Sequence, residues 1–498
     1  MSIPTITKEN YIEIIKTHGI NVVWNHILSN YNSIKNDFIN VDNFHNLYEM
    51  ALSTNSVHKK QSGQFFTPKL TAELTADFLS DYKTENVCDV ACGTGTLILE
   101  YFEKIGEEKT KELLKQKRVF LYDADETALN ICTFIICHKY GYEYKDNITV
   151  VNADFLDKNI ALPKNSKVIS NPPYFQFKTF KDNWDITNSL KAGKELYVAF
   201  MEKIIKQSSC AVLITPWTFL CAEKFFPFRR FLNDYYTEVY CFDNIPCGIF
   251  GGKLYDDETS LKPNQIRASI TVVDKNKDAG IYTTDLIRFS PTEKESILQK
   301  EFLKTRLNPQ KQIIDDTTTK IYKCAPELNN LLHNWINNST NTLNDLISEK
   351  ETDYKLTVPN MCRYYMCGAK GELKRTGKFE FYLKDYKSFV FAYVLFNSSF
   401  AYWYWRLYDG GINFQKSLMK TIPVFNEKID EETFADLEKI VNRLISEESK
   451  NKTTKMNAGK PQENIKIPNE DREKINDIFC KILNIPTNLL HLHKNTYL

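Results

Sequence analysis

Short apolar runs alternate with longer amphipathic stretches between residues 86 and 170. The runs have the length and the β-branched composition of buried strands, whereas the stretches between them repeat apolar residues every three or four positions, as helices do. Strands that alternate with helices in this way predict a doubly wound α/β unit. The strands are expected at residues 86–90, 118–122, 148–151 and 168–170.

The same alternation continues after residue 170. An amphipathic helix is expected at residues 195–203, and it leads to apolar strands at residues 211–214 and 268–273. Together with the segment that precedes the first strand, these elements predict one α/β domain over residues 59–290.

The segment before the first strand has two parts. Residues 1–58 have the pattern of short amphipathic helices, for which we expect a packing or positioning role. Residues 58–68 then bring together a glycine, two aromatic residues, Thr67 and Pro68, and they form either a loop that contacts a ligand or the start of an ordinary capped helix. Thr67 is the expected N-cap and Pro68 the first helical residue of a helix that reaches Leu79.

The alternation fades after residue 290. Residues 291–345 are expected to form a helical connector, because apolar residues recur there at helical spacing. Residues 346–498 are expected to form a separate α+β domain that ends in a helical tail. Within it, the polar stretch of residues 450–463 is expected to be a flexible linker.

Composition narrows the class of protein. A chain of 498 residues is too long for one ordinary core, and 26% charged with 42% hydrophobic residues indicates a globular protein. A net charge of +1 means that any nucleic-acid contact needs locally concentrated Lys and Arg. The twelve cysteines show no metal or disulfide framework, and the group of Cys132, Cys137 and His138 lies among apolar residues, which favours buried packing. No signal peptide or membrane-spanning run is visible, so we expect a soluble cytoplasmic protein without a membrane partner.

The strongest chemical candidate is Asn171-Pro172-Pro173-Tyr174, which follows the fourth strand. The two prolines fix φ and remove two amide donors, so the strand ends in a rigid turn. Because ligands bind at the carboxyl ends of strands in an open α/β sheet, the Asn171 oxygen and a fixed backbone carbonyl would face a crevice there. Two convergent acceptors suit the amino group of a nucleobase, with Tyr174 against the base face. For this motif taken alone, a plain Asx/Pro turn is the alternative.

The first strand ends in a glycine-containing turn. Gly93 and Gly95 allow a ligand to approach the backbone closely, although many such turns merely pack. Asp89, which precedes the turn, can take an ammonium group or a bridging water.

The second and third strands end at acidic residues. Asp123 ends the second strand, where ribose hydroxyls are bound in this architecture, and Asp125 is expected to cap the following helix. Asp154 follows the third strand, where it can accept a hydrogen bond from an adenine amino group while Phe155 flanks the ring.

In this order the motifs resemble those of restriction–modification DNA methyltransferases of the N6-adenine type, in the gamma arrangement. The likeness covers residues 60–290 and rests on Gln64–Pro68, Asp89–Gly95, Asp123, Asp154–Phe155 and Asn171–Tyr174. It implies a Rossmann-like seven-stranded sheet, S-adenosylmethionine as cofactor, and target recognition in the C-terminal domain. The residues that it implies for cofactor binding are Phe66, Thr67, Pro68, Asp89, Ala91, Cys92, Gly93, Gly95, Asp123, Asp154 and Phe155, and those for catalysis are Asn171, Pro172, Pro173 and Tyr174.

Contacts to the substrate are expected in two places. The family places an aromatic residue on the far face of the extruded base, and Phe250 fits this role best, with a core aromatic as the alternative. Between residues 363 and 387, seven Lys and Arg stand against three acids and among aromatics, which suits phosphate contact and base reading. A solvated strand face is the alternative there. The expected substrate contacts are Tyr174, Phe250, Arg363, Lys374, Arg375 and Lys378.

The resemblance implies a sequence-specific DNA methyltransferase that modifies N6 of a flipped-out adenine in double-stranded DNA. A separately encoded restriction endonuclease is an expected partner. Two other functions remain open: methylation of RNA amino groups or protein glutamine, and a non-catalytic subunit for DNA specificity.

Overall fold

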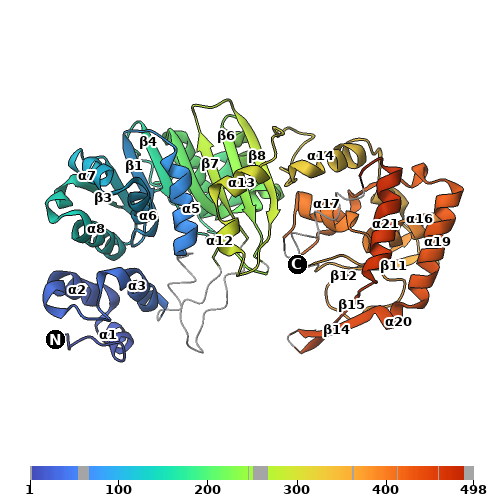
Figure 1. Ribbon diagram of the computed structural model, residues 1–498, viewed down its shortest axis with the longest axis horizontal. Helices are drawn as coiled ribbons and strands as arrows, with labels where there is room; N and C mark the ends of the chain where they lie inside the picture. The colour runs from blue at the N-terminus through green and yellow to red at the C-terminus, as the bar shows by residue number, and fades with distance from the viewer. Residues whose placement is uncertain are drawn as a thin grey trace. The chain divides into compact units, whose positions relative to one another are not determined.

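The computed structural model describes residues 3–53, 67–244, 246–250, 267–361, 364–411, 413–457 and 459–486. The chain forms two compact units (Figure 1). The first comprises Met1–Thr283 and Ser290–Ile321, and the second comprises Thr284–Phe289 and Tyr322–Leu498. These boundaries do not coincide with the divisions expected at residues 58, 290 and 345.

The first unit is built on an eight-stranded sheet in the order β3-β2-β1-β4-β5-β7-β6-β8. Strands β1 to β5 pair in parallel, and β7 runs antiparallel to both of its neighbours, β5 and β6. The α/β fold is confirmed, with β8 as one strand beyond the seven expected. The strands are β1 Asn86–Val90, β2 Val119–Asp123, β3 Ile148–Asn152, β4 Ser166–Ser170, β5 Cys210–Pro216, β6 Tyr236–Phe242, β7 Ala268–Asp274 and β8 Gly280–Ile287.

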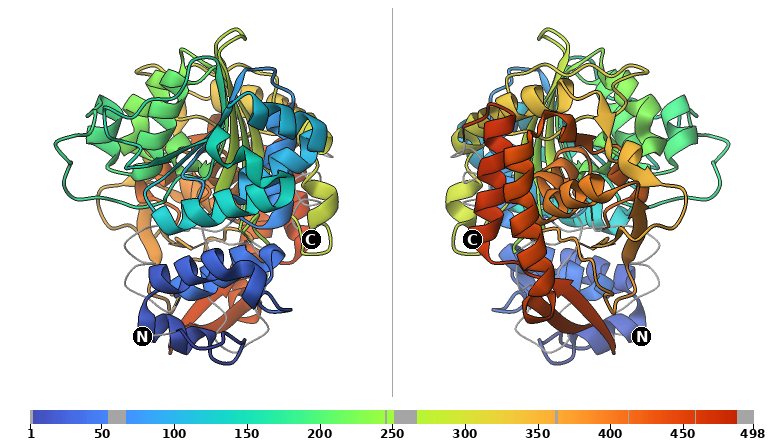
Figure 2. Two further views of the ribbon diagram at one scale, coloured as in Figure 1. Left: turned by 90° about the vertical axis from the view of Figure 1, so that its left-hand side faces the viewer. Right: turned by 90° about the vertical axis from the view of Figure 1, so that its right-hand side faces the viewer.

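Helices cover both faces of this sheet, which is why its central strands are apolar (Figure 2). Every residue of β4 and β5 is buried. The pairing register aligns the carboxyl ends, with Val90 opposite both Tyr122 and Ser170. The loops that follow β1, β2 and β4 therefore meet at one edge of the sheet. The helices that contact strands of this sheet include α5 Lys69–Ser80, α6 Thr96–Ile105, α8 Glu126–Tyr140 and α10 Leu196–Gln207.

The N-terminal helices belong to the first unit: α2 packs against α8, and α1 packs against α2 and α3. They are α1 Tyr11–His18, α2 Ile20–Ile34 and α3 Phe44–Ser53. The Tyr31 ring of α2 meets the Phe134 ring of α8 edge-on, with 5.3 Å between centroids. Residues 290–321 also belong to this unit, since Lys300 in α13 (Lys300–Arg306) donates to Asp81 beyond the end of α5 at 2.8 Å.

The second unit combines helices with small antiparallel sheets, as an α+β domain does. A three-stranded sheet, in the order β10-β12-β11, joins Ile347–Ser348, Lys378–Leu383 and Lys355–Pro359. The four longer helices are α16 Tyr386–Asn397, α17 Phe400–Tyr408, α19 Glu431–Ser446 and α21 Asn469–Ile482.

The flexible linker expected at residues 450–463 is wrong. The structure forms a β-hairpin there, with β14 at Lys452–Asn457 and β15 at Lys460–Ile465. Gly459 in the connection has φ of 76°, a left-handed conformation that a tight hairpin turn requires and that glycine adopts at little cost.

Two negative findings concern the described residues. No helix there is apolar over the length needed to cross a bilayer. No group of three or more His, Cys, Asp or Glu side chains is arranged there to hold a metal ion.

Candidate active site

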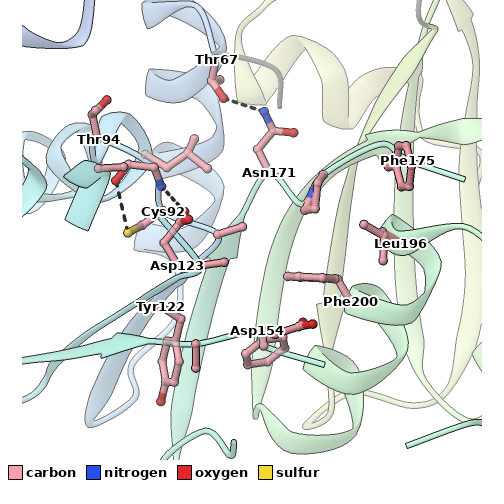
Figure 3. Close-up of a pocket in the computed structure, with 18 of the residues that line it drawn as sticks. Thr67, Cys92, Thr94, Tyr122, Asp123, Asp154, Asn171, Phe175, Leu196 and Phe200 are labelled. Atoms are coloured by element: carbon pink, nitrogen blue, oxygen red, sulfur yellow. Dashed lines mark hydrogen bonds between the residues drawn. The ribbon is translucent and has the colours of Figure 1, made fainter. Parts of the chain in front are cut away.

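A cavity of about 490 Å³ lies at the carboxyl ends of β1, β2, β3 and β4 (Figure 3). Each strand sends the residues just beyond its end to the wall: Ala91 to Thr94 after β1, Asp123 and Ala124 at the end of β2, Ala153 to Phe155 after β3, and Asn171 and Pro173 after β4. The far wall comes from α10 with Leu196 and Phe200. The site therefore follows from the parallel register of the sheet.

The two glycines of the first turn have different roles. Gly93 has φ of 53°, and a Cβ added there would meet no heavy atom within 4 Å, so its backbone is open to a ligand. A Cβ on Gly95 would instead lie 2.4 Å from Cys132 Sγ in α8. Gly95 therefore lies close against α8 and is not among the described residues that line the cavity, so its contact with a ligand stays a prediction. Ala91 lines the cavity with φ of 59°, which is unusual for a residue with a side chain.

Asp89 does not reach the cavity. It lies inside β1 rather than at its end, is fully buried, and its Oδ2 accepts from the Ile98 backbone N–H of α6 at 3.2 Å. Burial raises its pKa well above the ordinary value for a carboxyl. Asp89 is not among the described residues that line the cavity, and its hydrogen bond ties β1 to the start of α6, so the direct cofactor contact expected from sequence stays a prediction.

Asp123 and Asp125 divide the tasks at the end of β2. Asp123 accepts from the Gly93 backbone N–H at 2.7 Å and from the Asp125 backbone N–H at 2.9 Å. Burial raises the pKa of Asp123 to about 6 despite these bonds. The Asp125 side chain accepts from Ala128 N at 3.2 Å as the N-cap of α8, so the expected capping role is confirmed.

Asp154 lines the cavity, but protein groups occupy its carboxylate. Oδ2 accepts from Lys181 Nζ at 2.7 Å and from Trp184 Nε1 at 3.0 Å, and Oδ1 accepts from the Leu156 backbone N–H at 3.1 Å. Burial opposes ionisation, but these hydrogen bonds outweigh it and lower the pKa of Asp154. The structure thus gives this carboxylate partners other than the adenine amino group that was expected. Phe155 is buried beside the cavity, with its ring 5.4 Å from the Phe200 ring.

Asn171 stands directly after β4, and its side chain points toward Thr67 (Figure 3). Its Nδ2 donates to Thr67 Oγ1 at 2.9 Å, and its Oδ1 accepts from the Tyr174 hydroxyl at 2.6 Å. The expected N-cap role of Thr67 is wrong, because Pro68 occupies the cap position of α5 and the helix starts at Lys69. The Thr67 hydroxyl is used for Asn171 instead.

Tyr174 and Phe250, which are expected on the two faces of a base, contact each other edge-on. Their ring centroids lie 6.3 Å apart at an interplanar angle of 72°, which is an edge-to-face contact. Tyr174 also packs edge-on against Tyr197 at 6.2 Å, and its hydroxyl reaches Ile214 O at 3.0 Å. Both rings therefore pack within the protein, and Pro173, rather than Tyr174, lines the cavity.

Sequence reasoning missed the contribution of α3. Tyr48 and Leu52 line the cavity, and the Tyr48 hydroxyl donates to Asp125 Oδ2 at 2.6 Å. His45 Nδ1 lies 2.7 Å from Thr94 Oγ1 in the turn after β1, and burial lowers the pKa of His45 to about 4. The helical pattern of α3 predicts an apolar face, but nothing in it indicates which element that face meets.

The DNA contacts expected in the second unit stay predictions, and the structure shows what some of these side chains contact. Arg375 donates to Gly377 O at 2.8 Å and to Glu463 O at 3.1 Å, and Lys378 pairs with Glu380 at 3.2 Å, so both side chains support their own unit. Lys374 is exposed. Arg363, like Phe66 and the rest of the Gln64–Phe66 motif, lies outside the described residues.

Part of the chain is similar to known DNA methylases and to methylase subunits of restriction enzymes. Residues 39–221 match the family model described as N-6 DNA Methylase. The chain is 25% identical over 307 residues to the type I restriction enzyme MpnII methylase subunit of Mycoplasma pneumoniae, and this covers 56% of the chain and 52% of that protein. It is 26% identical over 162 residues to the MjaVIII methylase subunit of Methanocaldococcus jannaschii, which covers 31% of the chain and 26% of that protein. The chain thus spans about half or less of these relatives.

Solved structures with a similar chain course include modification proteins. A modification subunit of a putative type I restriction enzyme from Vibrio vulnificus YJ016 aligns with a TM-score of 0.37 and 16% identity, over 64% of each chain. The EcoKI M protein aligns with a TM-score of 0.36 and 13% identity, over 60% of this chain and 73% of that one.

Proposed function

We propose, from the match of residues 39–221 to the N-6 DNA Methylase family model, that the protein transfers a methyl group from S-adenosylmethionine to N6 of an adenine in duplex DNA. The observation that carries the proposal is the position of Asn171 directly after β4, on the wall of the cavity that Gly93 and Asp123 also line. This position puts an amide beside the space in which a methyl donor would be held.

The cavity suits S-adenosylmethionine in size and lining. Its volume of about 490 Å³ lies within the range of roughly 300–1,000 Å³ that is common for small-molecule sites. The open backbone at Gly93 leaves room for the ligand, the Asp123 carboxylate can accept from ribose hydroxyls, and the Phe155 ring offers an apolar face. When bound, this cofactor supplies an electrophilic methyl group.

Asn171 would hold the amino group of the substrate. An adenine must leave the base stack before its amino group can enter such a cavity. An amide oxygen has two lone pairs, so Asn171 Oδ1, which accepts from the Tyr174 hydroxyl, would also accept one N–H bond of the substrate. The Pro172 carbonyl would accept the other. The role of Tyr174 is then to orient Asn171.

Two acceptors at the amino group do the chemical work that the protein must supply. They draw the nitrogen lone pair out of conjugation with the ring and direct it toward the methyl donor. No strong base is required, because an amino nitrogen that has gained a methyl group is acidic and loses its proton to the acceptors or to water.

The test is methyl transfer from labelled S-adenosylmethionine to duplex DNA. Asn171→Ala should lower kcat about 10²-fold or more, as loss of one preorganised polar group does in other enzymes, while the Kd for the cofactor stays within about twofold. Asn32→Ala, at an exposed position of α2, is the matched control. Near-normal turnover by Asn171→Ala would reject the assignment.

Two other functions are outcomes of the same experiment. Label that enters RNA or the glutamine of a protein, but not DNA, would identify a different amino-group acceptor. A protein that binds cofactor and DNA but transfers no methyl group would be a specificity subunit.

The relatives suggest what the protein works with. Both are named as methylase subunits of type I restriction enzymes, so we infer that separately encoded restriction components are partners. We also infer that the second unit recognises the DNA target, and that the protein acts in the cytoplasm, where its substrate would be.

A further inference from the structure

The β14–β15 hairpin is a regular two-stranded ribbon. Six residue pairs join its strands, from Lys452 opposite Ile465 to Asn457 opposite Lys460 (Figure 1). Since side chains alternate between the faces of a strand, Lys455, Asn457 and Lys460 share one face, and Met456 points to the other.

The base of the ribbon is fastened to the second unit. Glu463 accepts from the Lys374 backbone N–H at 2.6 Å, and its own N–H donates to Lys374 O at 3.0 Å. The Arg375 guanidinium bonds to both Glu463 and Asn464, and Ile465 is 1% exposed in the core of the unit. The ribbon therefore has a fixed origin.

The tip of the ribbon, which we define as residues 455–457 and 459–461, is exposed on both faces. Met456 is 67% exposed, more than any other large apolar residue that the structure describes. Lys455, Asn457 and Lys460 are exposed as well. Within the described ranges, no hydrogen bond or ion pair engages the side chains of these three residues. Their side chains therefore add no polar contact to the described part of the unit.

Charge concentrates on this ribbon. Residues 450–466 contain five lysines and one glutamate, whereas the whole chain has a net charge of +1. The glutamate, Glu463, lies at the base, where its carboxylate also meets Lys452 Nζ at 3.4 Å. The two lysines of the tip are left without an acidic neighbour on the ribbon.

We infer that the tip of the ribbon inserts into a groove of duplex DNA, where Lys455 and Lys460 contact phosphates. The inference rests on the proposed function. A B-DNA major groove, about 12 Å wide, admits a two-stranded ribbon, and neutralised phosphates supply most of the affinity. Exposure on both faces is what insertion between two groove walls requires. Asn457 and Met456 are groups of the kind that meet base edges.

The experiment uses the full chain and a methylation assay on duplex DNA. The preferred site is first identified from the methylated adenines in the genome of a host that expresses the wild-type protein. Duplexes with that site are then used at several salt concentrations. Lys455→Ala/Lys460→Ala should raise KM for DNA about tenfold or more and reduce the slope of log affinity against log salt by about two, with kcat at saturating DNA within about twofold.

Two controls separate contact from damage. Lys455→Arg/Lys460→Arg keeps both charges and should keep the salt slope. Lys428→Ala/Lys439→Ala removes two exposed lysines elsewhere in the unit and should leave KM within about twofold of wild type.

Two results would overturn the inference. A ribbon variant with the KM and salt slope of the Lys428→Ala/Lys439→Ala control would show that the tip does not touch DNA. A wild-type protein that binds S-adenosylmethionine but labels no DNA would overturn the proposed function, and this inference with it.

Discussion

At the scale of single residues, Asn171 is notable for how firmly its amide is held. Thr67 accepts from its nitrogen and Tyr174 donates to its oxygen, at 2.9 and 2.6 Å. These bonds fix the orientation of the amide, and therefore the direction in which its oxygen points. Thr67 lies just before α5 and 104 positions from Asn171 in the chain, so neither motif alone reveals the pair.

Thr67→Val removes the acceptor for Asn171 Nδ2 and keeps the shape of the side chain. A neutral hydrogen bond contributes about 1 kcal/mol, so kcat should fall roughly five- to tenfold as the amide becomes free to rotate. Initial rates at saturating cofactor measure this, with a separate cofactor titration because Thr67 lines the cavity. Thr67→Ser should behave like wild type. Wild-type kcat in the valine variant would contradict the positioning role.

Asp123 predicts a pH dependence of stability. Its pKa is about 6 in the folded protein and ordinarily near 3.8, so between these values the folded state keeps a proton that the unfolded state has lost. The contribution of Asp123 to the free energy of unfolding therefore falls as pH rises from about 4 to 6, by about 3 kcal/mol in all. Asp123→Asn should abolish this component. Denaturant unfolding of both proteins across this pH range measures it, and identical pH profiles would exclude it.

At the scale of elements, α3 connects the N-terminal helices to the cavity. His45 bonds to Thr94 in the first turn, and Tyr48 bonds to Asp125 at the start of α8. Asp125 in turn donates its backbone N–H to Asp123. A helix that shows only an amphipathic pattern in the sequence thus supports the residue expected to bind ribose.

Tyr48→Phe removes the hydroxyl that donates to Asp125. A hydrogen bond to a charged group is worth about 1.5–3 kcal/mol, so α3 should dock more weakly and its amides should exchange hydrogen faster. Cofactor affinity should fall as well, because Tyr48 lines the cavity. Hydrogen exchange and calorimetric titration measure the two effects. The control is Tyr142→Phe, because Tyr142 is 52% exposed. Equal rates of hydrogen exchange in the two variants would contradict the prediction.

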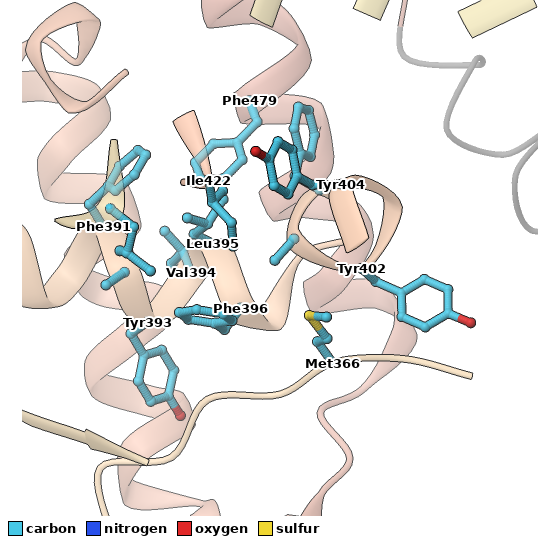
Figure 4. Packing of buried hydrophobic residues seen from close by; sticks show 14 of the residues in the cluster. Met366, Phe391, Tyr393, Val394, Leu395, Phe396, Tyr402, Tyr404, Ile422 and Phe479 are labelled. Carbon is cyan, nitrogen blue, oxygen red and sulfur yellow. The ribbon is translucent and has the colours of Figure 1, made fainter. Parts of the chain in front are cut away.

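At the scale of the whole molecule, the chain has two separate cores. The second unit is filled by aromatic side chains from α16, α17 and α21 (Figure 4). Phe479 is fully buried there, with its ring 4.8 Å from that of Phe425. The described residues that line the cavity all belong to the first unit. Cofactor binding should therefore survive damage to the second core.

Phe479→Ala tests this independence. Removing a buried Phe side chain costs about 3–5 kcal/mol, so the second unit should unfold at lower denaturant concentration while the first is unaffected. The Kd for S-adenosylmethionine should stay within about twofold, and methylation of DNA should fall. Calorimetric titration below the new transition measures the Kd. Loss of cofactor binding in the folded variant would show that the two units depend on each other.

Local rules account for the strands and turns that the sequence predicted. Runs such as residues 168–170 are apolar because β4 is covered on both faces, and Asp125 caps α8 with its nearest neighbours in the chain. The sequence pattern does not predict β6 or β8, and it predicts a flexible linker at residues 450–463, where the hairpin forms. The hairpin contains polar residues such as Lys452, Thr454 and Glu463, so its sequence lacks the alternation of apolar residues that is typical of a strand. Glu463 is bonded to Lys374 and Arg375, which lie far from it in the chain.

The order of the elements and the residues at the carboxyl ends of the strands follow from the sequence, because both depend on periodicity and short-range backbone rules. The directions of the side chains and their hydrogen-bond partners, in contrast, depend on the tertiary structure. Asp89 accepts from the Ile98 N–H, Asp154 accepts from Lys181, and Asn171 donates to Thr67. The physical reason is that these contacts join residues far apart in the chain, and packing chooses among acceptors that composition alone leaves equivalent.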